Sequence, residues 1–249
     1  MRGAGCTYND IVDQDLDKQV DRTALRPLPA GTVSNQQAWI WLFAQCGIGL
    51  LVLLCLPRLA QIISLLSIPL VAAYPFMKRI TWWPQLWLGL TFNWAVLVAY
   101  AAKAGELSPA VFILYGGLIF WTVGYDTIYA CQDIEDDAFI GIKSTARRFG
   151  AKIKQGVGFF YAASVLFIFA AITMTFIHTG TGIGQALVNS SLEALIFSLH
   201  LGWQVFKLKP DKAETALRLF KSNLWAGLLL AIWLYPTINT VELLENLTK

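Results

Sequence analysis

Charged residues are scarce in this sequence of 249 residues, since Asp, Glu, Lys and Arg together make up only 14% of it. Soluble globular proteins carry about 25% charged residues. With 56% hydrophobic residues and a mean hydropathy of +0.55, the chain lacks the charge needed to cover a soluble surface. This deficit excludes an ordinary soluble domain and indicates an integral membrane protein.

Patterns typical of metal-binding cysteines and of nucleic-acid binding are also absent. The four cysteines show no CxxC and no Cys/His ligand spacing, and the two histidines suggest no metal site, so we interpret the cysteines as packing residues. The net charge of +3 is small, which predicts no nucleic-acid partner. No apolar run precedes the first charges, and this predicts no cleavable signal peptide.

Long apolar segments are what the sequence contains instead. A helix needs about 20 apolar residues to cross a bilayer. Five stretches meet this length without an internal charge, namely 38–56, 59–76, 83–102, 155–177 and 222–240. Two more carry one acid each, Asp126 within 109–131 and Glu193 within 181–206. The sequence therefore predicts an all-α integral membrane protein with seven transmembrane helices in a lipid bilayer.

The basic residues lie mostly on one side of these segments. If the side that holds residues 1–37 is called side one, 16 of the 19 Lys and Arg residues belong to it, and Arg58, Lys103 and Lys249 belong to the other side. Cytoplasmic loops carry an excess of basic residues. We therefore expect side one to face the cytoplasm of a bacterium, or the matrix if the protein lies in a mitochondrial inner membrane.

The acidic residues gather in two short clusters. The first is NDIVDQDLDKQVD (9–21) and the second is YDTIYACQDIEDD (125–137), and together they hold ten of the 16 acids. Four predicted spans separate the clusters, so both are expected on side one. Each contains three aspartates at helical spacing, namely Asp10, Asp13 and Asp17 (i, i+3, i+7), then Asp126, Asp133 and Asp137 (i, i+7, i+11). Each set is therefore expected to form one stripe on a helix.

Stacked carboxylates repel one another, and a divalent cation would relieve that repulsion. Ligation by oxygen alone is typical of Mg²⁺ or Ca²⁺, and Mg²⁺ commonly uses one or two carboxylates together with substrate phosphate oxygens. Arg22 and Arg26 follow the first cluster, while Lys78 and Arg79 end a predicted span on the same side. Because Lys78 lies one turn after Tyr74, we interpret it as a ligand contact. The combination indicates a clamp for a diphosphate.

A diphosphate site beneath a helical bundle suggests a substrate with a charged head and a lipid tail. If the head is an allylic diphosphate, its ionisation leaves a carbocation that needs a dry cavity and aromatic faces. The candidate aromatic residues are Tyr125, Tyr129, Trp82, Trp83 and Phe92. For the tryptophans, anchoring at the membrane interface is the alternative role.

These motifs resemble those of a known family. NDIVDQDLD fits the motif NDxxDxxxD, and the segment YDTIYACQDIEDDAFIGIKSTARRFG (125–150) carries a partner DxxxD at Asp133 and Asp137. With the strings MRGAGCTYND and AAYPFMKRITWWPQLWLGLTFNW, they are similar to the UbiA family of intramembrane aromatic prenyltransferases. The resemblance extends to the branch that acts on 4-hydroxybenzoate in ubiquinone synthesis. It covers residues 1 to about 225 and weakens after 155.

The resemblance implies a reaction and roles for particular residues. A polyprenyl chain would pass from polyprenyl diphosphate to the ring of 4-hydroxybenzoate, ortho to its hydroxyl, through Mg²⁺-dependent formation of an allylic cation. The implied metal ligands are Asp10, Asp13, Asp17, Asp133 and Asp137. The implied substrate-binding residues are Arg2, Asn9, Arg26, Tyr74, Lys78 and Asp126. Asp126 is also the candidate catalytic residue, and Arg2 suits a benzoate carboxylate because a guanidinium can pair with it through two hydrogen bonds.

The resemblance also bears on the extent of the chain. Family members have nine transmembrane helices, and the seven predicted here correspond to the last seven. We therefore expect residues 1–249 to form a single transmembrane prenyltransferase domain without the first two family helices, and Met1 to be an internal methionine of a longer sequence.

Several alternatives stay open. One is a related membrane prenyltransferase with another phenolic acceptor, and another is an inactive truncated fragment. A CDP-alcohol phosphotransferase would also combine aspartates with Mg²⁺, but in this sequence no aspartate of either cluster precedes a glycine, as its motif requires. A cation transporter would place acids near the middle of the membrane, whereas these lie at span ends and in loops.

Overall fold

The computed structural model describes residues 2–247, with side chains described at 3–20 and 23–232. All regular structure within these residues is helical. The helices are α1 (Arg2–Asp17), α2 (Asp21–Ala24), α3 (Asn35–Leu54), α4 (Arg58–Leu66), α5 (Ile68–Ile80), α6 (Pro84–Ala104), α7 (Pro109–Ala130), α8 (Ile134–Phe139), α9 (Thr145–Phe149), α10 (Ile153–His178), α11 (Ile183–Lys207) and α12 (Ala213–Leu247).

Five segments of the described chain are long and apolar enough to cross a membrane. They are α3, the pair α4–α5 (Arg58–Ile80), α6, α7 and the stretch Thr145–His178 that contains α10. Each coincides with one predicted span, so the prediction of an all-α membrane protein is confirmed. The other two predicted spans fall in α11 and α12, which are not among the five, and part of α12 lies outside the described side chains. The exact count of seven is therefore not confirmed.

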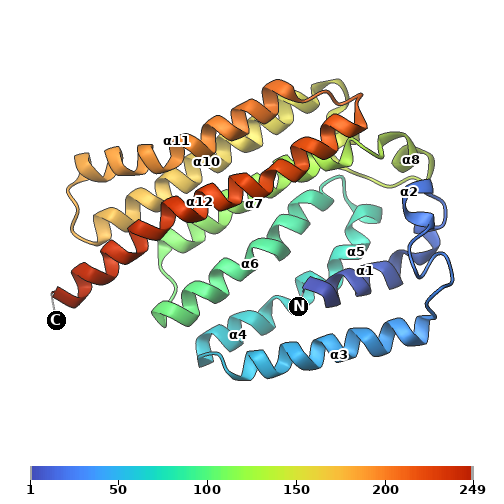
Figure 1. The fold of residues 1–249 in the computed structure, drawn as a ribbon, viewed down its shortest axis with the longest axis horizontal. Coiled ribbons are helices and arrows are strands. Elements are labelled where there is room, and N and C mark those ends of the chain that lie inside the picture. Colours follow the sequence, from blue (N-terminus) through green and yellow to red (C-terminus); the bar gives the residue numbers. More distant parts are fainter. Residues whose placement is uncertain (1, 248–249) are drawn as a thin grey trace.

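The helices are arranged around α6 and α7. Figure 1 shows α7, α10, α11 and α12 running alongside one another on one side of α6, while α1, α3, α4 and α5 lie on its other side. Contacts between α1 and α5 and between α1 and α3 attach the N-terminal helix to this second group. The first acidic cluster therefore lies beside α5, although more than forty residues separate the two in sequence.

Close helix packing holds α7 against α10. A Cβ atom on Gly124 of α7 would lie 2.3 Å from Cε1 of Tyr161, and one on Gly117 would lie 3.1 Å from the backbone nitrogen of Ile168. Small residues at such positions let two helices approach closely in a membrane. The second acidic cluster follows α7, so this packing sets its position.

The predicted span 59–76 is broken in the structure. Helix α4 ends at Leu66 and α5 begins at Ile68, with Pro69 in the first turn of the new helix. Proline lacks an N–H and clashes with a preceding turn, so a helix cannot continue through it undisturbed. Helix α5 therefore starts as a new helix, and its residues Tyr74 and Lys78 lie on the part that approaches α1.

Candidate active site

The first acidic cluster lies on α1 and is paired with basic residues. Arg26, in the turn after α2, donates hydrogen bonds to Asp10 at 3.1 Å and to Asp17 at 3.0 Å. These two aspartates therefore share a face of the helix, as their spacing predicts. Partial burial raises the pKa of the Asp10 carboxyl, although the Arg26 guanidinium opposes this effect.

Asp13 connects α1 with α5. Its carboxylate is fully buried and lies 2.6 Å from the Lys78 ammonium and 3.1 Å from the Arg79 guanidinium. The Lys78 contact is an ion pair without the alignment of a hydrogen bond, since Oδ2 of Asp13 has no hydrogen-bond partner among the described residues. Arg79 also donates to the carbonyl of Val12 at 2.9 Å. Asp13 thus holds the cationic end of α5 against α1.

The second acidic cluster does not lie on one continuous helix. Helix α7 ends at Ala130, a turn follows, and Asp133 stands at the N-cap position of the short helix α8. The expectation that Asp126, Asp133 and Asp137 form a single helical stripe is therefore wrong. Although the turn interrupts the helix, all three carboxyl groups line one shared space.

That space is a cavity of about 230 Å³ between the two clusters. Its lining includes the predicted site residues Asn9, Asp17, Arg26, Tyr74, Lys78, Asp126, Asp133 and Asp137. Asp10 and Asp13 are not part of this lining, and Asp10 faces a neighbouring hollow of about 430 Å³ between α1 and α3. The side chain of Arg2 lies outside the described residues.

Four polar residues of the lining were not selected from the sequence. They are Thr23 in α2, Gln85 at the start of α6, and Lys143 and Ser144 in the loop that follows α8. Residue type alone gave no reason to choose Gln85. Lys143 and Ser144 belong to the quoted string 125–150, so their proximity to the second cluster was the available signal.

The cavity has the chemistry of a site for phosphate and a hard cation. Four carboxyl groups and three basic side chains line it. Within the described part of the chain, no three His, Cys, Asp or Glu residues converge closely enough to hold a metal ion by themselves. Mg²⁺ at phosphate sites commonly takes one or two carboxylates and completes its shell with phosphate oxygens and water. The carboxylates of the cavity therefore suit Mg²⁺ that a phosphate also ligates.

Most of the candidate aromatic residues pack elsewhere. Tyr129 lines the cavity, and its ring lies 4.5 Å from that of Phe220. Tyr125 contacts Trp121, with 5.6 Å between the ring centres. Trp82 lies beneath the guanidinium of Arg147, which is 5.4 Å from the ring centre. Tyr129 and Tyr74 are thus the aromatic rings available to a ligand within the described lining.

Three curated relatives of this chain carry the same name. The 4-hydroxybenzoate polyprenyltransferase, mitochondrial, of Rattus norvegicus is 44% identical over 231 residues, which is 92% of this chain and 59% of that protein. The protein of the same name from Homo sapiens is 43% identical over 92% of this chain and 60% of its own length. The one from Arabidopsis thaliana is 40% identical over 91% and 54%. The chain thus spans less than two thirds of the length of these relatives.

Solved structures share the fold. The apo structure of a UbiA homologue from Aeropyrum pernix K1 matches with a TM-score of 0.76 and 26% identity, covering 95% of this chain and 85% of that one. A UbiA homologue from Archaeoglobus fulgidus bound to GPP and Mg²⁺ matches with a TM-score of 0.68 and 19% identity, covering 96% and 83%. In sequence, the profile of the UbiA prenyltransferase family matches residues 1–227. The chain belongs to the UbiA prenyltransferase family.

Proposed function

We propose that this chain carries the active site of a Mg²⁺-dependent 4-hydroxybenzoate polyprenyltransferase, which attaches a polyprenyl chain to the aromatic ring in ubiquinone synthesis. The observation that carries the proposal is the single cavity lined by both aspartate motifs together with Arg26 and Lys78. The shared name of relatives at 40–44% identity supports 4-hydroxybenzoate as the acceptor.

The charge of the cavity favours a diphosphate held together with Mg²⁺. Its carboxylates lie beside its basic side chains, so a diphosphate bound there would meet repulsion from Asp17, Asp133 and Asp137 that a divalent cation would relieve. Asp17, Asp133 and Asp137 are the proposed ligands within the cavity. Asp10 and Asp13 stay predicted ligands, and through their ion pairs they hold Arg26 and Lys78 in place. When bound, Mg²⁺ stabilises negative charge on the departing pyrophosphate.

The residues of the chain then act on the two substrates. Arg26 and Lys78 stabilise the pyrophosphate as the allylic C–O bond breaks. Tyr129 offers an aromatic face to the cation and helps to exclude water. The ring carbon ortho to the phenol attacks the cation, and Asp126 accepts the ring proton. Arg2 pairs with the carboxylate of 4-hydroxybenzoate.

Transfer of a labelled prenyl chain tests this proposal. Membranes that contain the protein, as this chain and as a fusion with the part of the rat relative that the match does not cover, are incubated with labelled polyprenyl diphosphate and 4-hydroxybenzoate. We expect product with Mg²⁺ and none with EDTA. Asp133→Ala should abolish transfer because it removes a cavity carboxylate, whereas Asp211→Ala, in the exposed turn after α11, should leave it unchanged.

The other outcomes are equally informative. Unchanged turnover in Asp133→Ala would contradict the metal–diphosphate scheme. Product with another phenol but not with 4-hydroxybenzoate would select a related prenyltransferase. Product from the fusion alone would show that the chain needs the added part for activity, and no product from either would indicate that the chain is inactive.

A further inference from the structure

Gln85 is a buried polar residue of the cavity wall that has no role in the proposed reaction so far. Gln85 is only 5% exposed, and it lines the cavity at the start of α6. Its Oε1 accepts a hydrogen bond from the backbone N–H of Thr145 at 3.0 Å. A backbone N–H can only donate, so this contact fixes which end of the amide is oxygen. The NH₂ group is thereby directed away from Thr145.

The NH₂ group of Gln85 is a hydrogen-bond donor without an acceptor among the described residues. Within the described residues Nε2 donates no hydrogen bond, and it is not among the atoms sealed inside the protein. Leaving a buried polar group without a hydrogen-bond partner is unfavourable. A donor that is held in place and opens onto a cavity is therefore suited to an oxygen atom of a ligand.

The surroundings of Gln85 favour an anionic oxygen. The backbone N–H of Lys143, two residues before Thr145, donates to the carbonyl of Lys78 at 2.9 Å, so the loop and the end of α5 meet at this wall. Pro84 and Gln85 also form the first turn of α6, a helix of 21 residues. The N–H groups at a helix N-terminus favour negative charge, and phosphate above all.

We propose that Nε2 of Gln85 donates a hydrogen bond to a phosphate oxygen of the prenyl diphosphate. This inference rests on the proposed function and adds a ligand contact to it. Gln85 is at the same time a tether of the loop after α8, because it accepts from Thr145. The two roles predict opposite behaviour in variants that keep the oxygen but lose the donor.

The loop has other tethers, so a change at Gln85 does not release it. The Lys143 ammonium donates to the carbonyl of Ile80 at 3.0 Å. Arg147 donates to the carbonyl of Asp137 at 3.1 Å and also to that of Ile142. Variants of Gln85 should therefore report on the ligand and keep the fold.

Binding of inorganic pyrophosphate with MgCl₂ to the purified chain in detergent tests the contact by calorimetry. Gln85→Met removes both the oxygen and the donor, whereas Gln85→Glu keeps an oxygen for Thr145 and replaces the donor with negative charge. We expect the dissociation constant to rise about tenfold in Gln85→Met and further in Gln85→Glu, because a hydrogen bond to a charged group is lost and, in the second variant, a charge repels. Gln185→Glu, at an exposed position of α11, is the matched control and should bind as the original chain does.

A purely structural Gln85 would give the reverse order. Gln85→Glu would then bind pyrophosphate normally, and only Gln85→Met would bind weakly, which would overturn the proposal. A second arm uses 4-hydroxybenzoate alone, whose binding should be the same in all variants. Weaker binding in this arm only would assign Gln85 to the aromatic acid and contradict the phosphate contact.

The failure of this inference can be told from the failure of the proposed function. If the original chain binds pyrophosphate and the Gln85 variants bind it equally well, the Gln85 contact is wrong and the proposed function stands. If the original chain binds neither pyrophosphate nor 4-hydroxybenzoate, the proposed function fails and the contact fails with it.

Discussion

At the scale of single residues, neighbouring aspartates of α1 have different environments. The Asp13 carboxylate is fully buried between Lys78 and Arg79, whereas the Asp15 carboxylate is 93% exposed and pairs with Lys18. Both aspartates belong to one cluster, and their residue type is the same. Only the side of the helix on which each lies separates a buried ion pair from an exposed one.

Replacing each aspartate with the isosteric asparagine measures this difference. Asp13→Asn leaves two cations without their counter-charge and should lower the free energy of unfolding by about 2 kcal/mol, less than the roughly 3–5 kcal/mol of a fully buried pair, because Lys78 and Arg79 are partly exposed. Asp15→Asn should have no measurable effect, since exposed ion pairs contribute little. Thermal unfolding in detergent compares the two, and equal midpoints would contradict the buried ion pair as a source of stability.

At the scale of helices, the contact between α7 and α10 positions the second aspartate motif. Gly124 leaves room for the Tyr161 ring, whose hydroxyl donates to Gln204 on α11. Three helices are thus held together at one level of the bundle. Gly158 of α10 is the natural comparison, because a Cβ there would meet nothing closer than Val205 Cγ1 at 3.7 Å.

Alanine at the two glycines should therefore have opposite effects. Gly124→Ala forces the buried Tyr161 ring to move and should lower the free energy of unfolding by about 1–3 kcal/mol. Gly158→Ala has space and should raise it by about 0.5–1 kcal/mol, because alanine favours the helix over glycine. The midpoint of thermal unfolding measures both. A stable Gly124→Ala variant would show that α7 and α10 tolerate a wider separation.

The local sequence anticipates some of these helices better than others. Five apolar runs match spans of the structure because hydropathy and length are properties of a short segment. Pro69 inside the run 59–76 was a visible signal for the break between α4 and α5. A search by hydropathy and length overlooks it, because the run stays apolar through the proline. The turn after Ala130 had no such marker, and so the stripe expected for Asp126, Asp133 and Asp137 was wrong.

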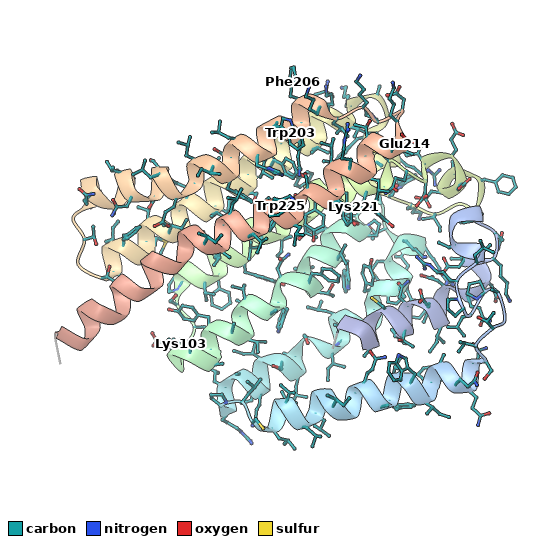
Figure 2. The ribbon with its side chains drawn as sticks, in the orientation of Figure 1. Lys103, Trp203, Phe206, Glu214, Lys221 and Trp225 are labelled. Atoms are coloured by element: carbon teal, nitrogen blue, oxygen red, sulfur yellow. The ribbon has the colours of Figure 1, made fainter. Side chains whose placement is uncertain are left out.

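At the scale of the whole molecule, the distribution of charge predicts an orientation in the membrane. Figure 2 shows Lys103 at one end of the bundle, and Glu214 and Lys221 toward the opposite end of the helices. The cavity lies at the ends of α5 and α7 and beside α1, and Lys78 and Arg79 occupy the last turn of α5. Trp203 and Trp225, also labelled, are 41% and 63% exposed, as expected for side chains facing lipid.

Cysteine labelling in sealed, right-side-out vesicles tests the orientation. Cys55 is exposed after α3, on the side opposite the cavity, and Lys209 is exposed after α11 on the cavity side. With the other cysteines changed to serine, a membrane-impermeant maleimide should label Cys55 in intact vesicles. The Lys209→Cys variant, made without Cys55, should react only after the vesicles are opened. Labelling of both from the same side would contradict the predicted topology.

The sequence by itself determined that this chain crosses a membrane, and it predicted that the basic residues gather on one side and that two aspartate motifs belong to one site. These properties depend on composition and spacing within short segments. The tertiary structure decided that Asp13 pairs with Lys78, that Asp10 lies outside the cavity, and that Gln85 joins its wall. Such contacts link residues that are tens of positions apart in sequence. The packing of the helices sets the distances between them, and no short segment of the sequence encodes that packing.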